Sequence, residues 1–180
     1  AERETTFPVN ERADAGKEGK SCITAYRGKK QQERLSMSRI KICGLRRPED
    51  IAAVNEARPD YCGFIVEYPK SRRSIDRTTL RELVRGLREE IVPVGVFVNA
   101  PKALVAELLE EGTIQIAQLH GQEDENYIRQ LRIMTDQLLI KAFSIKTEAD
   151  IKKAIRSEAD YILLDQGAGA DQDDADACGI

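Results

Sequence analysis

Short apolar runs alternate along the chain with stretches in which apolar residues recur every three or four positions. Short apolar or β-branched runs bounded by turn residues are typical of buried strands, whereas the three-to-four spacing predicts amphipathic helices. The regular pattern begins at Ile40. It predicts strands at residues 39–43, 61–66, 92–98, 114–120, 138–143 and 161–165, and helices at about residues 48–56, 77–89, 101–111, 124–134 and 148–156.

Local signals agree with these boundaries. Pro48 and Pro101 stand where a first helical turn tolerates a missing backbone N–H. Thr147 and Asp150 have the spacing of a capping box, in which a hydroxyl and a carboxylate accept hydrogen bonds from the first N–H groups of a helix. Strands that alternate with helices indicate βαβ crossovers and a parallel sheet. A doubly wound open sheet can end after six strands, whereas a (β/α) barrel closes only with two more βα units.

The segments on either side of this pattern differ from it in composition. Residues 1–38 are rich in Glu, Arg, Lys, Gly and Ser without any period, so we expect a disordered leader, and Met37 is a candidate natural start. Residues 39–169 form the predicted barrel domain. Residues 170–180 carry four Asp and no apolar stripe, and this abrupt change is typical of a frameshift or a truncation.

Composition and charge narrow the function classes. Of the 180 residues, 41% are hydrophobic and 33% are charged, which is a soluble globular balance. The formal net charge of −3 argues against a nucleic-acid binder, which would carry a basic excess. The sequence has no apolar run near the ~20 residues that span a membrane and no secretory signal pattern. We therefore expect a cytoplasmic protein without nucleic-acid or membrane partners.

Few residues are available to hold a metal or a nucleotide. The four cysteines have no CxxC spacing and no neighbouring histidine, so neither a zinc site nor disulfides are expected. They are Cys22, Cys43, Cys62 and Cys178. His120 is the single histidine. The absence of GxGxxG and GxxxxGK[ST] sequences leaves a nucleotide-phosphate loop without support.

Reacting groups of a (β/α) barrel lie at the carboxyl ends of its strands. Cys43 ends the first predicted strand and shares a face with Lys41, so both point into the barrel if Ile42 packs on helices. A thiol near a lysine can act as a base or nucleophile in its thiolate form. The alternative for Cys43 is that of a small buried apolar residue. Cys62, inside the second strand, is expected only to pack.

Three other strand ends carry candidate groups. Asp165 ends the sixth strand, where a carboxyl can protonate a leaving oxygen or simply begin a turn. The loop at 68–75 has three cations in four positions, including Arg73, and indicates an anionic substrate or a solvated run of charge. His120, at the fourth strand end, is a candidate for lining the pocket.

In this order and spacing, the segments resemble the phosphoribosylanthranilate isomerase family across about residues 39–169. That resemblance implies a TIM (β/α)8-barrel type of α/β fold, incomplete here because about six strands and five helices are seen. The matching segments are KICG at 41–44, RPED at 47–50, GFI at 63–65, PKSRRSI at 69–75, VGVFVN at 94–99, IAQLHG at 116–121, IKA at 140–142 and LLD at 163–165.

The resemblance also implies a reaction and roles for single residues. Members of the family convert N-(5-phosphoribosyl)anthranilate to the 1-deoxyribulose phosphate of tryptophan biosynthesis by an Amadori rearrangement, without metal or cofactor. Asp165 would be the general acid that opens the ribose ring, and Cys43 the general base that removes the C2′ proton. Arg73 would hold the anthranilate carboxylate of this small phosphosugar substrate.

The chain departs from the family after the sixth strand. Residues 166–169 begin a glycine-rich phosphate loop, which then runs into acidic residues that are electrostatically wrong for a phosphate. We therefore expect the polypeptide alone to be inactive or marginally folded, with apolar edges on its first and sixth strands. A non-catalytic remnant or partner-binding fragment is the alternative. A ribulose-phosphate epimerase is disfavoured because it needs several metal-ligating histidines.

Overall fold

The computed structural model describes residues 38–166. The chain divides into two units, Ala1–Arg39 and Ile40–Ile180, and the described elements all belong to the second. Residues 1–37 of the expected leader and the acidic tail at 170–180 lie outside the described residues, as do residues 167–169 of the expected phosphate loop.

Six parallel strands form one curved sheet in their order along the chain, β1-β2-β4-β5-β6-β7. A short seventh strand, β3, pairs in parallel with the end of β2 beyond β1. Sequential parallel order with a helix after each strand is the arrangement of a (β/α) barrel. The strands are β1 (Lys41–Cys43), β2 (Tyr61–Val66), β3 (Ser74–Ile75), β4 (Val92–Phe97), β5 (Ile116–Leu119), β6 (Leu138–Ile145) and β7 (Tyr161–Gln166).

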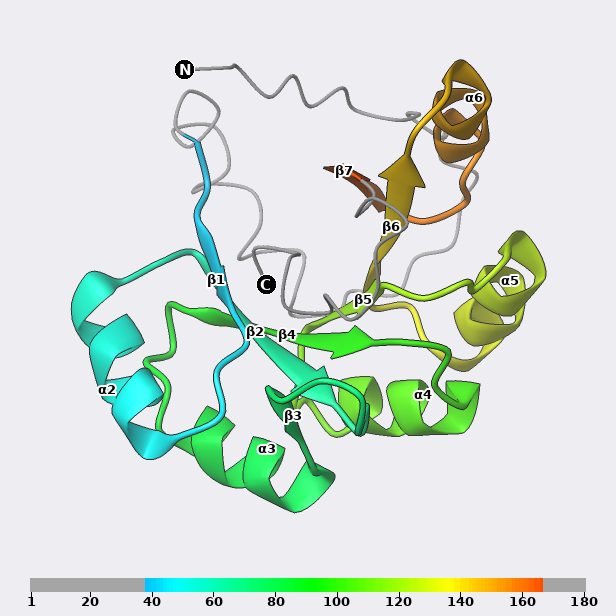
Figure 1. Ribbon diagram of the computed structural model, residues 1–180. Helices are drawn as coiled ribbons and strands as arrows, with labels where there is room; N and C mark the ends of the chain where they lie inside the picture. The colour runs from blue at the N-terminus through cyan, green and yellow to red at the C-terminus, as the bar shows by residue number, and fades with distance from the viewer. Residues whose placement is uncertain (1–37, 167–180) are drawn as a thin grey trace, which may run out of the picture. The chain divides into compact units, whose positions relative to one another are not determined.

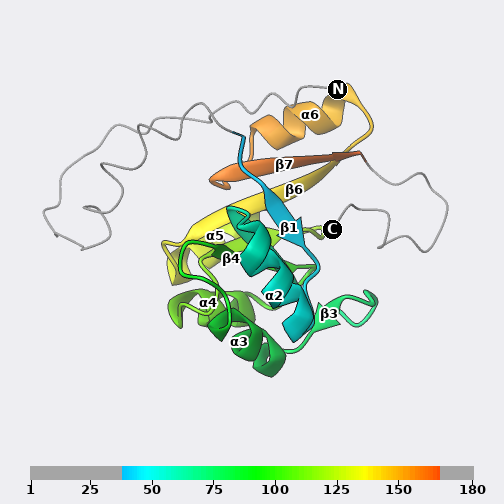
Figure 2. The ribbon, with the colours of Figure 1, turned by 90° about the vertical axis from the view of Figure 1, so that its left-hand side faces the viewer.

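The helices lie on the outer side of the curved sheet (Figure 1), and the view turned by 90° places α2 and α3 on that side as well (Figure 2). They are α2 (Pro48–Ala57), α3 (Arg77–Arg85), α4 (Lys102–Glu110), α5 (Glu125–Met134) and α6 (Glu148–Ile155). Three begin at a side chain that accepts a hydrogen bond from an early backbone N–H, which satisfies a donor that the helix itself leaves unpaired. These caps are Asp76, Asp124 and Thr147.

Alternation along each strand separates a core face from an interior face. Cys62, Phe64 and Val66 of β2 belong to the hydrophobic core between sheet and helices, so Gly63 and Ile65 face the interior. The same holds for Ala117 and Leu119 of β5, which leaves Gln118 on the interior face. The prediction that Cys62 only packs is confirmed, because its side chain is wholly buried in this core.

The predicted strands and helices are found, with differences at their ends. β1 starts at Lys41 rather than at residue 39. α3 ends at Arg85, four residues before the predicted end, because Gly86 caps it. Pro101 is the N-cap of α4 and lies just outside the helix instead of in its first turn. The capping box of Thr147 and Asp150 is confirmed.

Among the described residues, β1 and β7 are the two ends of the strand order, as the sequence predicted for the first and sixth strands. β7 carries exposed apolar side chains on both faces, from Leu163 and Leu164. None of the helices described here is long and apolar enough to cross a membrane.

Candidate active site

Lys41 and Cys43 both point to the interior face of the sheet, as the alternation of β1 predicts. The Nζ atom of Lys41 lies 3.5 Å from the Sγ atom of Cys43. The neighbouring strand makes room for them, since Cys43 is level with Gly63 of β2. A Cβ atom on Gly63 would lie 2.3 Å from Cys43 Sγ and 3.0 Å from Lys41 Cε. The missing side chain at Gly63 therefore admits both groups.

A chain of polar contacts crosses the interior from β1 to β7. Lys41 Nζ donates to Gln118 Oε1 at 2.5 Å, and Gln118 Nε2 lies 2.8 Å from Nδ1 of His120. On the far side of the imidazole ring, Nε2 faces Asp165 Oδ2 at 3.6 Å. Three side chains thus connect Cys43 with Asp165: Lys41 of β1, Gln118 of β5 and His120 of the β5–α5 loop.

The His120 side chain is half-buried and lies between Gln118 and Asp165 in this series of contacts. Burial lowers the pKa of its imidazole below the usual value, and the nearby Asp165 carboxylate opposes that shift. Lys41 and Lys141 act with burial, whereas Glu123 acts with Asp165. The neutral ring is therefore favoured near pH 7, with one nitrogen that accepts and one that donates.

The cationic loop after β2 folds back so that Arg73 covers the end of β1. Its closure rests on backbone turns and on β3, where Tyr68 N–H donates to Ser74 Oγ at 2.8 Å. Gly44 follows Cys43 with a φ of 86°, which favours glycine. A Cβ atom on Gly44 would lie 2.7 Å from Cδ and 3.0 Å from Nη1 of Arg73. Arg73 and Cys43 are thus brought to the same end of β1.

A buried ion pair fixes the loops beside His120. Lys141 Nζ of β6 lies 3.1 Å from Glu123 Oε2, and it also donates to the Gly121 carbonyl at 2.7 Å. Glu123 accepts the N–H groups of Asn99 at 2.7 Å and Gly121 at 2.9 Å. The pair therefore ties the loops after β4 and β5 to β6, and with them the position of His120.

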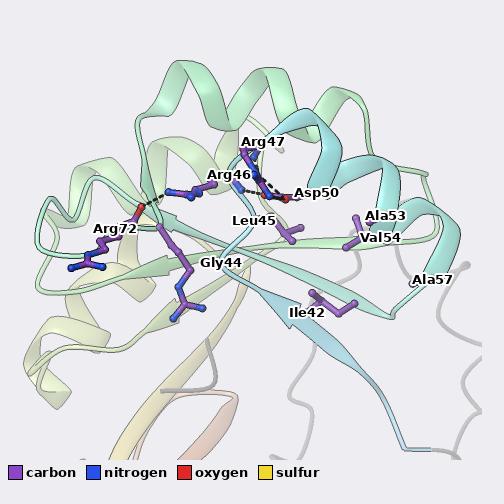
Figure 3. A pocket seen from close by; sticks show the side chains of 11 residues that line it. Ile42, Gly44, Leu45, Arg46, Arg47, Asp50, Ala53, Val54, Ala57 and Arg72 are labelled. Atoms are coloured by element: carbon purple, nitrogen blue, oxygen red, sulfur yellow. Dashed lines mark hydrogen bonds and ion pairs between the residues drawn. The ribbon is translucent and has the colours of Figure 1, made fainter. Parts of the chain in front are cut away.

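A shallow pocket of about 510 Å³ lies beside Ile42, on the face of β1 opposite Cys43, and Arg73 is among the residues that line it. Figure 3 shows Ile42 of β1 opposite Ala53, Val54 and Ala57 of α2, with Arg46 and Arg47 also lining the pocket. Ile42 faces outward where Cys43 faces inward. The pocket therefore does not include Cys43 or the polar contacts that lead from it to Asp165. In the close-up, Arg46 donates to the Arg72 carbonyl at 2.9 Å and holds the cationic loop against the start of α2 (Figure 3).

The structure thus brings the predicted residues together in two groups, Cys43 with Arg73 and His120 with Asp165. The residues that join them, Lys41 and Gln118, were not predicted as site residues. A signal for Gln118 existed, since it is a polar residue inside the apolar fourth strand. Within residues 38–166, no group of three or more His, Cys, Asp or Glu side chains is arranged to hold a metal ion.

Parallel strands in sequential order, outer helices and polar side chains at the carboxyl ends of the strands define a protein of the (β/α)-barrel class. A sequence profile described as N-(5'phosphoribosyl)anthranilate (PRA) isomerase matches residues 40–175. The chain belongs to this family.

Relatives and solved structures agree. N-(5'-phosphoribosyl)anthranilate isomerase of Caldanaerobacter subterraneus subsp. tengcongensis is 39% identical over 129 residues, which are 72% of this chain and 61% of the relative. The crystal structure of phosphoribosyl anthranilate isomerase from Thermotoga maritima superposes with a TM-score of 0.65 at 33% identity, covering 75% of this chain and 64% of that one. The chain spans about six tenths of the length of the curated relatives it matches.

A further solved structure holds a ligand. It is described as phosphoribosyl anthranilate isomerase in complex with reduced 1-(o-carboxyphenylamino)-1-deoxyribulose 5-phosphate. It superposes with a TM-score of 0.63 at 34% identity, and the match covers 72% of this chain and 65% of that chain. That ligand is a phosphosugar that carries an aromatic carboxylate.

Proposed function

We propose that this chain carries the acid–base part of a phosphoribosylanthranilate isomerase site. The reaction is the Amadori rearrangement of N-(5-phosphoribosyl)anthranilate to 1-(2-carboxyphenylamino)-1-deoxyribulose 5-phosphate, a cytoplasmic step of tryptophan biosynthesis. Family membership supports the reaction, and the ligand of the related structure supports the substrate class. No metal or cofactor takes part in the proposed steps.

Two side chains transfer protons to and from the substrate as the aldose derivative becomes the ketose. Asp165 in its acid form protonates the ribose ring oxygen, the bond from that oxygen to C1′ breaks, and a Schiff base forms between C1′ and the anthranilate nitrogen. Cys43 as thiolate then removes the proton from C2′. The resulting enolamine takes up a proton at C1′ as the C2′ hydroxyl becomes a carbonyl. Each general acid–base step contributes roughly 10²–10⁴-fold in rate.

One observation carries the proposal most directly: the contacts from Cys43 through Lys41, Gln118 and His120 to Asp165. They support it because the proposed base and the proposed acid then share one interior face, at the carboxyl ends of β1 and β7. A sugar between these ends can meet a proton donor at its ring oxygen and a proton acceptor at C2′. Side chains on opposite faces of the sheet would not permit this.

Arg73 and His120 have substrate-binding roles in this proposal. The guanidinium of Arg73 matches a carboxylate in two charge-assisted hydrogen bonds, and its place over Gly44 puts it beside the base. The anthranilate carboxylate would therefore bind at the β1 end. His120 lines the sugar pocket between Gln118 and Asp165.

The test follows the loss of phosphoribosylanthranilate fluorescence with the purified chain. A second arm adds the carboxyl-terminal remainder of the Caldanaerobacter relative as a separate polypeptide, since the chain spans 61% of that protein. Turnover in either arm that disappears in Cys43→Ser and Asp165→Asn, but persists in the exposed-site control Asp136→Asn, supports the proposal. Absence of turnover in both arms, or turnover unaffected by the two substitutions, contradicts it.

A further inference from the structure

The buried amide of Gln118 has a fixed orientation. Its side chain is 1% exposed, and its oxygen and nitrogen have different partners. Lys41 has only donors to offer, so the Gln118 atom that it contacts at 2.5 Å must be the oxygen, which accepts. The amide nitrogen, which donates, is therefore directed to the other side, where Nδ1 of His120 lies 2.8 Å away.

This orientation determines where the neutral imidazole carries its proton. An Nδ1 atom that meets an N–H donor must accept, so it has no hydrogen of its own. The single proton of neutral His120 is then on Nε2, the atom that faces Asp165 at 3.6 Å. Burial keeps the ring neutral by lowering its pKa. The N–H that Asp165 meets is thus a consequence of contacts on the opposite side of the ring.

We infer that Lys41, acting through Gln118, sets the tautomer of His120 and so presents an Nε2–H donor to Asp165. Lys41 and Gln118 are positioning residues in this scheme. The inference rests on the proposed function, in which Asp165 is the general acid. At 3.6 Å the Nε2–H faces the Asp165 carboxyl group from just beyond hydrogen-bond distance.

Lys41 also contacts the proposed base, because its Nζ atom lies 3.5 Å from the Sγ atom of Cys43. One ammonium group therefore contacts the proposed base directly and the proposed acid through two side chains. Gly63 is what allows this, since any Cβ there would meet Cys43 Sγ and Lys41 Cε. The tautomer of His120 is the part of this arrangement that can be measured without substrate.

The chain contains a single histidine, which makes the measurement direct. Labelling with ¹⁵N-histidine gives resonances from His120 alone, and a bare ring nitrogen is well separated from a protonated one. At pH 8 the wild-type chain should show a bare Nδ1 and a protonated Nε2, with the other tautomer at least about fivefold less populated. Fivefold is near the lower end of what one lost buried hydrogen bond costs.

Gln118→Glu is the decisive variant. A carboxylate at position 118 has no hydrogen to donate, and Lys41 offsets its charge, so Nδ1 can keep the contact only by taking a proton. Protonation of Nδ1 is therefore expected in Gln118→Glu and not in Gln122→Glu, which makes the same charge change at an exposed residue close to His120. A bare Nδ1 in Gln118→Glu, or a protonated Nδ1 in the wild type, would overturn the inference.

Substitutions of Lys41 test the first link. Lys41→Met lets the Gln118 amide turn over, so the Nδ1-protonated form should rise severalfold, whereas Lys41→Arg still only donates and should leave the spectrum unchanged. Lys41→Gln replaces the methionine variant if that one loses the wild-type far-UV circular dichroism. Identical spectra for wild type, Lys41→Arg and the neutral variant remove Lys41 from the scheme. Because no turnover is measured, this result stands apart from the fluorescence assay.

Discussion

The Lys141 ammonium lies 3.1 Å from the Glu123 carboxylate, and their side chains are 5% and 1% exposed. Burial lowers the pKa of Lys141, and the carboxylate opposes this shift. Each of these buried charges is compensated by the other, and removal of either partner would leave the remaining charge buried and unpaired. The pair joins the loops after β4 and β5 to β6. Its loss is therefore expected to change the position of His120, which lies in the β5–α5 loop.

Lys141→Met should lower the free energy of unfolding by about 3–5 kcal/mol, because it leaves Glu123 charged and buried. Glu123→Gln in the same background should recover part of that loss, since the amide oxygen still accepts a backbone N–H. Urea denaturation of the wild type, both single variants and the double variant measures the coupling. Additive effects in this cycle would show that the two side chains are not coupled.

Gly63→Ala should disturb β1 more than a typical surface change. The added Cβ would lie 2.3 Å from Cys43 Sγ and force the thiol to turn or the strands to separate. Crowding of this kind costs about 1–3 kcal/mol in the free energy of unfolding. Gly86→Ala is the matched control, because its nearest neighbour would be 3.3 Å away. Equal unfolding midpoints for the two variants would refute the close approach at Gly63.

The two cysteines of the described region should differ in reactivity with iodoacetamide. Burial raises the pKa of the Cys62 thiol to about 11, so little reactive thiolate forms at pH 8. The side chain is also wholly buried, which keeps the reagent away from it in the native chain. Cys43 is partly exposed on the interior face. Peptide mass spectrometry at pH 8 should find Cys43 alkylated well before Cys62, with the difference lost in urea. Faster modification of native Cys62 would contradict its place in the core.

Much of this arrangement follows from sequence alone because parallel strands are short apolar runs and reacting groups follow them. Alternation in β1 was enough to predict that Lys41 and Cys43 face inward. Gln118 and Lys141 were missed as functional residues for a physical reason. Each is a polar residue within an apolar strand, and its role depends on a contact partner that becomes a neighbour only in the folded chain. For Gln118 this partner is Lys41, 77 residues away, and for Lys141 it is Glu123. β3 was missed because two residues show no period.

Arg73→Ala should weaken substrate binding more than it slows the chemical steps. A lost charge-assisted hydrogen bond to a carboxylate costs about 1.5–3 kcal/mol, which corresponds to roughly 10–150-fold in kcat/KM. We expect most of this loss as a higher KM for phosphoribosylanthranilate, in whichever arm of the fluorescence assay shows turnover. Arg72→Ala, at an exposed neighbouring residue, is the control. An unchanged KM in Arg73→Ala would remove the residue from the proposed carboxylate site.

Stability should fall as the pH drops below about 6.5, and His120 is the reason. Its pKa is lowered in the folded chain by burial, so between the folded value and the ordinary one near 6.5 the unfolded chain binds more protons. Acidification in that window therefore favours unfolding, while above it the effect vanishes because both states are neutral. Asp165 and Glu123 face the ring and limit the shift, whereas Lys41 and Lys141 enlarge it.

Urea midpoints measured at pH 8, 7, 6 and 5.5 should therefore fall below pH 7 in the wild type and stay nearly level in His120→Asn. The carboxylates whose pKa values are lowered by hydrogen bonds, such as Asp76 and Asp150, lose their contribution only at lower pH, nearer their ordinary value of 3.8. Their titration is thus separate from that of the single histidine. A wild-type midpoint that rises on going from pH 7 to pH 6 would mean that the folded chain prefers a charged imidazole, which contradicts the lowered pKa of His120.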